Sequence, residues 1–213
     1  MGLLIAAFGC ADLRLDSAKS ETTSDDRADT AASRRVNSAS RQSDIDLRSV
    51  TGDIVSVSGL DSVVPNQTED NSTMFIFREQ SSLALPSALG YDVTVPGSGN
   101  APVREDSEIP AGTEVDVYFV HFDPVGSASK RFKATIAFPH TILGLQVGSE
   151  TLDAGDALVG RDDVEYPEPG SVTVRGLELG ADKLAFDDKR TLSVDFQTST
   201  SSDQMRVITS ADD

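Results

Sequence analysis

Acidic residues gather in one segment of this sequence, where their carboxylates could hold a cation. Six of them fall within sixteen positions: Asp153, Asp156, Asp162, Asp163, Glu165 and Glu168. Calcium takes six to eight hard oxygen ligands from a loop that folds around it, and the glycines at 155 and 160 permit tight turns. The spacing is not that of an EF-hand. The segment therefore predicts either a calcium site, built mainly on the first five of these acids, or a solvated acidic loop.

The two histidines, His121 and His140, are the only imidazoles that could act as a general base. His121 ends a strand-like run two residues before Asp123, so both side chains could point to the same side. A His–Asp pair orients an imidazole for general-base catalysis, but the sequence contains no G-x-S-x-G nucleophile motif. A pair that stabilises the strand end is the preferred interpretation, and a hydrolase using His121 and Asp123 is the weaker alternative.

Composition excludes several other kinds of site. The single cysteine, Cys10, rules out a disulfide framework or a Cys-ligated zinc site within one chain. The net charge of −17 argues against nucleic acid or an anionic membrane surface as a partner, because both need clustered Lys and Arg. Tryptophan is absent, so the usual aromatic platform for stacking sugars is missing. Arg175 and Arg206 interrupt apolar strand-like runs, and we expect them to pair with carboxylates as part of the structure.

The start of the chain has the pattern of an exported lipoprotein. Residues 1–10, MGLLIAAFGC, form a short apolar run in which Gly9 precedes Cys10, as in a lipoprotein cleavage box. We therefore expect Cys10 to carry a lipid. Residues 11–46 hold very few large apolar residues and predict a disordered polar linker. Residues 1–45 contain 6 Lys/Arg and 7 Asp/Glu, which leaves 12 and 28 for the rest, so the acidity belongs to the domain expected at 47–213.

From Leu47 onward, short strand-like runs alternate with turn signals. Both faces of Val115–Phe122 are apolar, which is typical of an interior strand covered on both sides. Phe132–Phe138 alternates as a half-buried strand, and the Pro/Gly turn before it suggests a hairpin with Val115–Phe122. Helical turns are expected only at Ser82–Leu89 and Ala154–Leu158. About ten short strands predict an all-β fold, a single antiparallel β-sandwich of jelly-roll type, with a barrel as the second choice.

Several short phrases occur together in one order: IPAGT, HFDPVG, ILG, LDAGDALVG, RGLEL and DQMRVIT. In this respect the chain resembles a group of exported bacterial β-sandwich proteins of unassigned activity, many of which end in a PEP-CTERM sorting tail. The resemblance covers roughly Ser58–Thr209 and implies fold and compartment. The tail is absent here, so we expect an N-terminal lipid anchor at Cys10 to replace it.

These features predict a non-enzymatic exported domain, tethered to the cell envelope and serving a structural role or an interaction at its surface. The membrane is expected to hold only the lipid anchor, and a protein or a glycan of the envelope is the expected partner. No cofactor is required by this hypothesis. The alternative is a calcium-stabilised module that binds a glycan or another polymer.

Overall fold

The computed structural model describes residues 45–92, 98–99, 107–126, 129–172, 175–178, 180–198 and 201–212. The lipobox-like segment with Cys10, and the predicted linker up to residue 44, lie outside the described residues. The described part is mostly strands with one short helix, and its two main sheets form a β-sandwich. The all-β sandwich expected from the sequence is therefore confirmed. Its first strand begins at Asp46, one residue before the predicted domain boundary.

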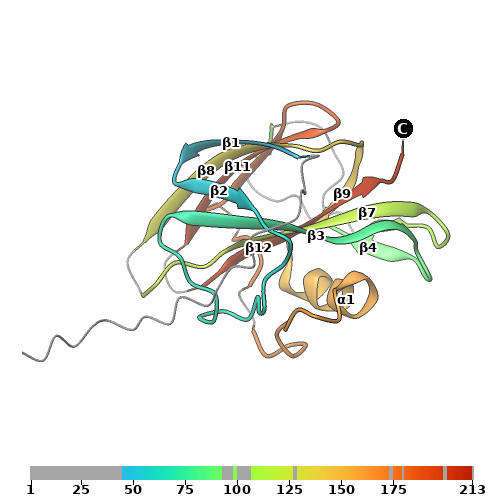
Figure 1. Ribbon diagram of the computed structural model, residues 1–213, viewed down its shortest axis with the longest axis horizontal. Coiled ribbons are helices and arrows are strands. Elements are labelled where there is room, and N and C mark those ends of the chain that lie inside the picture. The colour runs from blue at the N-terminus through green and yellow to red at the C-terminus, as the bar shows by residue number, and fades with distance from the viewer. Residues whose placement is uncertain are drawn as a thin grey trace, which may run out of the picture. The chain divides into compact units, whose positions relative to one another are not determined.

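Three sheets contain the described strands (Figure 1). Sheet A runs in the order β1 (Asp46–Thr51), β8 (Lys130–Ala137), β11 (Thr191–Thr198), β10 (Lys183–Phe186) and β5 (Ser98–Gly99). Sheet B runs in the order β2 (Asp53–Ser56), β3 (Thr73–Ala84), β7 (Glu114–Phe122), β12 (Asp203–Ser210) and β9 (Ile142–Gln146). A small third sheet pairs β4 (Leu89–Tyr91) with β6 (Ser107–Ile109).

The pairing corrects two details of the sequence prediction. β2 and β3 run parallel, whereas the other described pairs are antiparallel. The hairpin expected between Val115–Phe122 and Phe132–Phe138 is wrong, because β7 belongs to sheet B and β8 to sheet A. The chain crosses between the sheets here, and the rings of Phe122 and Phe132 meet across the sandwich with centroids 5.3 Å apart. Two apolar strands in sequence thus pack face to face without sharing hydrogen bonds.

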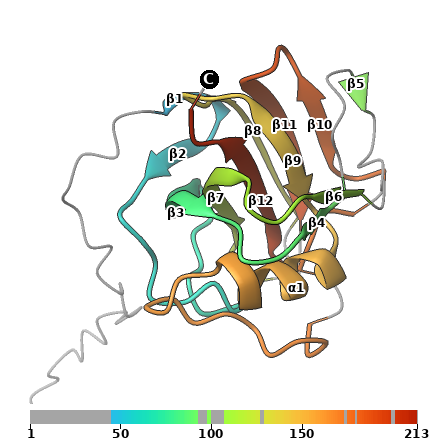
Figure 2. The ribbon, with the colours of Figure 1, turned by 90° about the vertical axis from the view of Figure 1, so that its right-hand side faces the viewer.

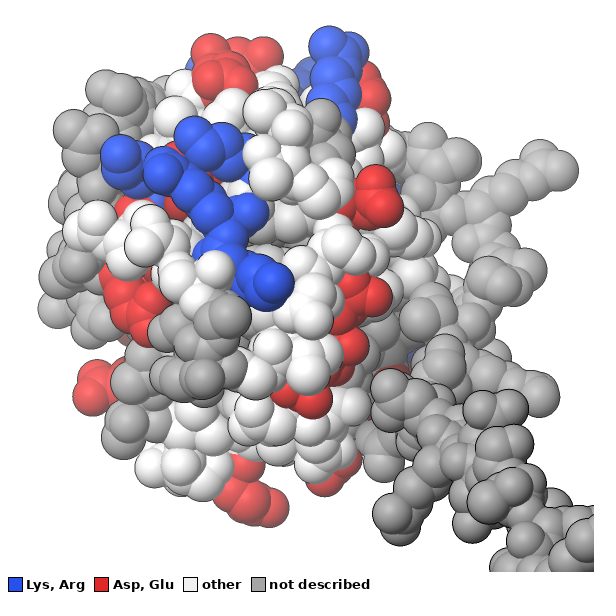
Figure 3. Space-filling model, turned by 90° about the vertical axis from the view of Figure 1, so that its left-hand side faces the viewer, with Lys and Arg blue, Asp and Glu red and all other residues white. Residues whose placement is uncertain are grey.

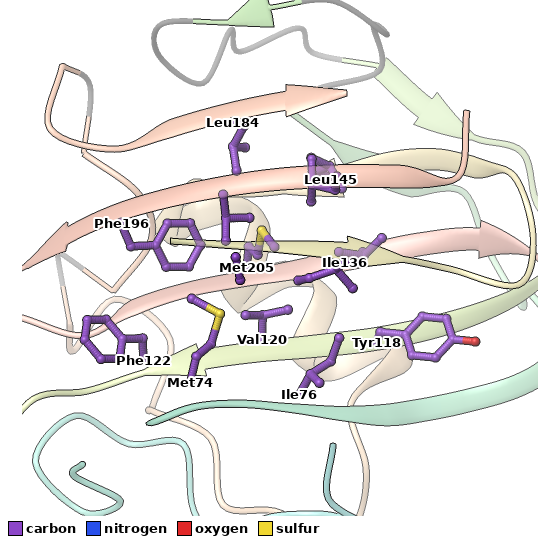
Figure 4. Close-up of a cluster of buried hydrophobic side chains, with 14 of the residues drawn as sticks. Met74, Ile76, Tyr118, Val120, Phe122, Ile136, Leu145, Leu184, Phe196 and Met205 are labelled. Carbon is purple, nitrogen blue, oxygen red and sulfur yellow. The ribbon is translucent and has the colours of Figure 1, made fainter. Parts of the chain in front are cut away.

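The main core lies between the two sheets. Figure 4 shows side chains such as Ile76 and Val120 of sheet B directed toward Ile136 and Phe196 of sheet A. The strands of sheet A alternate between buried and partly exposed residues, as in β11, because within the described residues only one face of this sheet is covered. Burying such apolar side chains contributes roughly 1.5–3 kcal/mol each, so this interface is the main source of stability.

Sheet B is covered on its outer face as well. Helix α1 (Ser149–Val159) lies across it on the side away from sheet A, as Figures 1 and 2 show. Leu152 of α1 belongs to a second core with Phe77 of β3 and Phe119 of β7. β7 is therefore buried at every position after Glu114, as its two apolar faces predicted.

The helix contains the helical turn expected at Ala154–Leu158, while that expected at Ser82–Leu89 is wrong, since β3 continues to Ala84. In the described part of the chain, no helix has the length and apolar character needed to cross a membrane.

Candidate functional site

Asp153 and Asp156 lie on one side of α1, where both carboxylates meet a buried arginine. They are three residues apart, so they are neighbours on the helix surface. Arg175 Nη1 donates to Asp153 Oδ1 at 2.8 Å and to Asp156 Oδ2 at 2.5 Å, and the Arg175 side chain is fully buried. The first two acids of the predicted calcium segment therefore neutralise a structural cation, and both lie on α1, which is longer than the helical turn expected at Ala154–Leu158.

Arg206 forms a second buried pair beside the first. Its guanidinium binds Glu79 through two bonds of 2.5 and 2.8 Å, and its Nη2 also donates to Asp156 Oδ1 at 2.8 Å. Burial alone lowers the pKa of Arg206, but the pairing with Glu79 and Asp156 raises it overall. The expectation that both arginines pair with carboxylates as part of the structure is confirmed. These pairs fasten α1 to the centre of sheet B.

The other acids of the predicted calcium segment do not join Asp153 and Asp156. Asp162 is exposed, and Asp163 accepts two bonds from Arg161, at 2.7 and 2.5 Å. Glu165 is exposed too, and its backbone pairs with Asp61 and Val63. The structure thus distributes these acids along a segment that covers sheet B. Among the described residues, a carboxylate group with the spacing of metal ligands forms at another place.

That place contains Glu178, Asp182 and Asp203. Each residue offers a carboxylate oxygen, and these oxygens all lie within 4.8 Å of one another. Asp182 precedes β10 of sheet A and Asp203 begins β12 of sheet B, so the group lies where the two sheets meet. Sequence reasoning missed it because Asp203 is distant in the chain from the other two acids. The one available signal was an acid directly before the apolar run of β12.

His121 and Asp123 are both buried, and each has another partner. Nε2 of His121 lies 3.2 Å from the carbonyl oxygen of Thr68, and its Nδ1 lies 3.2 Å from the amide nitrogen of Gln204. This arrangement fits a neutral ring with its proton on Nε2. Asp123 accepts a bond of 2.6 Å from the backbone N–H of Asn66. Because both ring nitrogens are already bonded, this geometry gives no support to the hydrolase alternative.

The outer face of sheet A carries a group of basic side chains. Lys133 of β8 and Lys183 of β10 both stand opposite Asp195 of β11, so the three side chains form a row across three strands. Arg131 donates two bonds of 2.6 Å to Asp195, and Lys133 lies 3.1 Å from it. The pKa of Asp195 is lowered, first by its hydrogen bond with Arg131 and then by Lys133.

With Arg48 of β1, these residues form what we call the basic face: Arg48, Arg131, Lys133, Lys183 and Asp195. Figure 3 shows Lys and Arg side chains gathered on one side of the domain, with acidic side chains scattered around them. A shallow hollow of about 300 Å³ opens on this face. Its lining includes the hydroxyls of Thr135 and Ser193, the small side chain of Ala185 and the exposed Val50. Arg131 and Lys133 lie together on β8 in the segment KRFK, but Arg48 and Lys183 come from other strands, so the sequence alone did not show that these residues share one face.

Comparisons with protein-family models, with curated proteins and with solved structures found no match to this chain. The function must therefore be argued from the sites themselves.

Proposed function

We propose that this chain is a non-enzymatic, exported β-sandwich domain that binds an acidic polysaccharide through the basic face of sheet A. In this proposal a lipid on Cys10 tethers the domain to the cell envelope. The observation that carries the binding function is the row of Lys133, Asp195 and Lys183 beside the hollow on an otherwise acidic protein. The resemblance to exported bacterial β-sandwich proteins supports the compartment.

The chemistry of the basic face suits a polymer with carboxylates and hydroxyls. Lys183 is exposed and has no ion-pair partner among the described residues, so its ammonium is available to a ligand carboxylate. Arg131 and Lys133 share Asp195 and keep side-chain exposures of 47% and 41%. The hydroxyls of Thr135 and Ser193 bond each other at 3.2 Å, and Ser193 donates to Asp187 at 2.7 Å, so both oxygens can still accept a hydrogen bond from a ligand hydroxyl. Such a mixture matches the alternating hydroxyl and carboxylate groups of a polyuronate.

Charge density favours a polysaccharide over a membrane or nucleic acid. Four cations share this face with Asp195, and Arg48 also pairs with Asp46. An anionic membrane attracts a protein by about 1 kcal/mol for each basic residue near its surface, so stable binding needs more cations than this face has. The net charge of −17 repels polyanions at long range. Because salt screens that repulsion beyond about 8 Å at physiological strength, the basic face governs close contact.

Binding to alginate, measured by isothermal titration calorimetry on the full chain, tests this function. The double variant Lys133→Glu/Lys183→Glu should lose affinity by about tenfold or more, because two contacts of about 1 kcal/mol are replaced by repulsion. The matched control is Lys189→Glu, which reverses an exposed charge in the turn between β10 and β11. It should change the affinity less than twofold, which corresponds to a change in binding free energy below roughly 0.4 kcal/mol.

Neutral dextran and vesicles containing phosphatidylglycerol complete the experiment. We expect no binding to dextran and only weak binding to the vesicles. An equal loss of alginate affinity in both variants would show that net charge, rather than the basic face, attracts the polymer. Vesicle binding that depends on Lys133 and Lys183, without alginate binding, would assign this face to a membrane and overturn the proposal.

A further inference from the structure

Asp203 is a buried carboxylate with no partner for either oxygen among the described residues. Its exposed fraction is 0%, and neither Oδ1 nor Oδ2 takes part in a hydrogen bond. Burial raises its pKa to about 9, with further increases from Asp182, Glu178 and Asp123. The hydroxyl of Thr198 lowers this pKa slightly, but it donates its own proton to the carbonyl of Ser201. A buried polar group without a partner is rare in folded proteins and calls for a ligand or another explanation.

The surroundings of Asp203 are oxygen-rich and hold further carboxylates in fixed positions. Asp182 accepts the backbone N–H of Glu178 on one oxygen, at 2.6 Å, and that of Gln197 on the other, at 2.8 Å. Glu178 accepts a bond of 3.0 Å from the Ser201 hydroxyl. A carboxylate has about four lone-pair sites, so both residues keep capacity for another ligand. Two of the three acids are therefore held in place by the fold.

This acidic group differs from those around α1 in lacking a basic partner. Asp153 and Asp156 are neutralised by Arg175 and Arg206. No ion pair with Lys or Arg is formed by Glu178, Asp182 or Asp203 within the described residues. Three carboxylates brought together without a cation repel one another in a medium of low dielectric constant.

We propose that Glu178, Asp182 and Asp203 bind a calcium ion. The ligand set consists of carboxylate oxygens, which suit a hard cation, and it contains neither imidazole nor thiolate. The Ser201 hydroxyl, backbone carbonyls and water would complete the six to eight oxygens that calcium takes. Magnesium is less well suited, because it demands a near-ideal octahedron and gives up its water reluctantly. This calcium site would act independently of the basic face, and the proposal of a calcium site does not depend on the proposed binding of a polysaccharide.

The calcium ion would link the two layers of the sandwich. Asp182 leads into β10 of sheet A, and Asp203 begins β12 of sheet B. A ligand that binds only the folded state stabilises it in proportion to the logarithm of its concentration. At a hundredfold excess over the dissociation constant, we expect the melting temperature to rise by about 5 °C or more.

The full chain, freed of metal with EGTA, provides the test. Equilibrium dialysis with radioactive calcium should detect one bound ion, and calcium should raise the melting temperature more than magnesium does. Asp203→Asn should abolish calcium binding. Without calcium this variant should melt at or above the temperature of the unaltered chain, because a neutral amide replaces a carboxyl whose ionised form is costly to bury. Glu178→Gln changes a partly exposed ligand, so it should fold and bind calcium at least tenfold more weakly.

Asp162→Asn is the matched control, since Asp162 is an exposed acid of the segment around α1. It should retain full calcium binding and the full rise in melting temperature. Absence of calcium binding in the unaltered chain would overturn the proposal. Binding that survives Asp203→Asn and Glu178→Gln, or that disappears with Asp162→Asn, would place the ion elsewhere and also overturn it.

Discussion

Replacing Arg206 by methionine should remove a large part of the domain's stability. Methionine has a similar length, so the packing against the Phe119 ring, 5.2 Å from the guanidinium carbon, is partly retained. Glu79, whose side chain is fully buried, would keep only the bond from the Tyr166 hydroxyl, at 2.6 Å. Removing one partner of a buried ion pair typically destabilises a protein by about 3–5 kcal/mol. Total stabilities are about 5–15 kcal/mol, so this loss should be large and easily measured.

A double-mutant cycle with Glu79→Gln measures how much of this loss comes from the Glu79 carboxylate that is left without its arginine partner. Glu79→Gln alone should cost about 1.5–3 kcal/mol, the usual contribution of hydrogen bonds to charged groups. The two changes together should cost no more than Arg206→Met alone, because the double variant leaves no buried carboxylate at position 79. The coupling energy should therefore exceed about 1.5 kcal/mol. Urea unfolding, followed by circular dichroism and tyrosine fluorescence, measures it, since the chain has no tryptophan.

Arg131→Met is the matched control for this cycle. Arg131 binds Asp195 through the same two-bond geometry, at 2.6 Å, but on the open face of sheet A. Its replacement should reduce stability far less than that of Arg206, since water solvates both charges. Additive effects of Arg206→Met and Glu79→Gln, within about 0.5 kcal/mol, would refute the reasoning. An equal loss in the control would refute it as well.

Burial, aided by Arg175, lowers the pKa of His121 from 6.5 to about 4 despite its bond to Thr68. Between these values the unfolded chain binds a proton that the folded chain excludes, so His121 alone should reduce the free energy of unfolding by about 3 kcal/mol as the pH is lowered from 6.5 to 4. Asp123, Asp182 and Asp203, whose pKa values burial raises to about 6, about 6 and about 9, act in the opposite sense in the unaltered chain and in any His121 variant. In urea titrations across this range, the free energy of unfolding of His121→Gln minus that of the unaltered chain should therefore rise by about 3 kcal/mol as the pH is lowered, and a constant difference would contradict the assignment. Labelling with radioactive palmitate in a bacterial host should mark the chain and fail with Cys10→Ser, whereas label that persists in the variant would exclude the lipid anchor.

The sequence predicted those features that depend on local patterns. Alternating apolar residues identified most strands, and the two apolar faces of β7 correctly indicated burial on both sides. The isolated positions of Arg175 and Arg206 among apolar residues correctly indicated structural ion pairs. In each case the relevant information lies within a few residues of the feature itself.

Features that depend on long-range pairing were not predictable in this way. A turn between two apolar strands is compatible with a hairpin or with a crossing between sheets, and only the packing of the remaining strands decides between them. Gly155 illustrates the same limit. In the sequence it was a glycine that permits tight turns, inside the helical turn expected at Ala154–Leu158. In the structure it lies within α1, where a Cβ atom would be 2.2 Å from both Arg206 Nη1 and Gln146 Oε1, two residues that lie outside this helix. The absence of a side chain there makes room for the buried arginine.

The position of β12 affects the order in which the domain can fold. β12 lies between β7 and β9, seven of its eight residues are buried, and it follows in the chain every strand with which it pairs. Pairings between segments so distant in sequence form slowly. Until β12 is synthesised, sheet B remains divided and Glu79 lacks Arg206. The sandwich should therefore be unable to close until β12 has been synthesised.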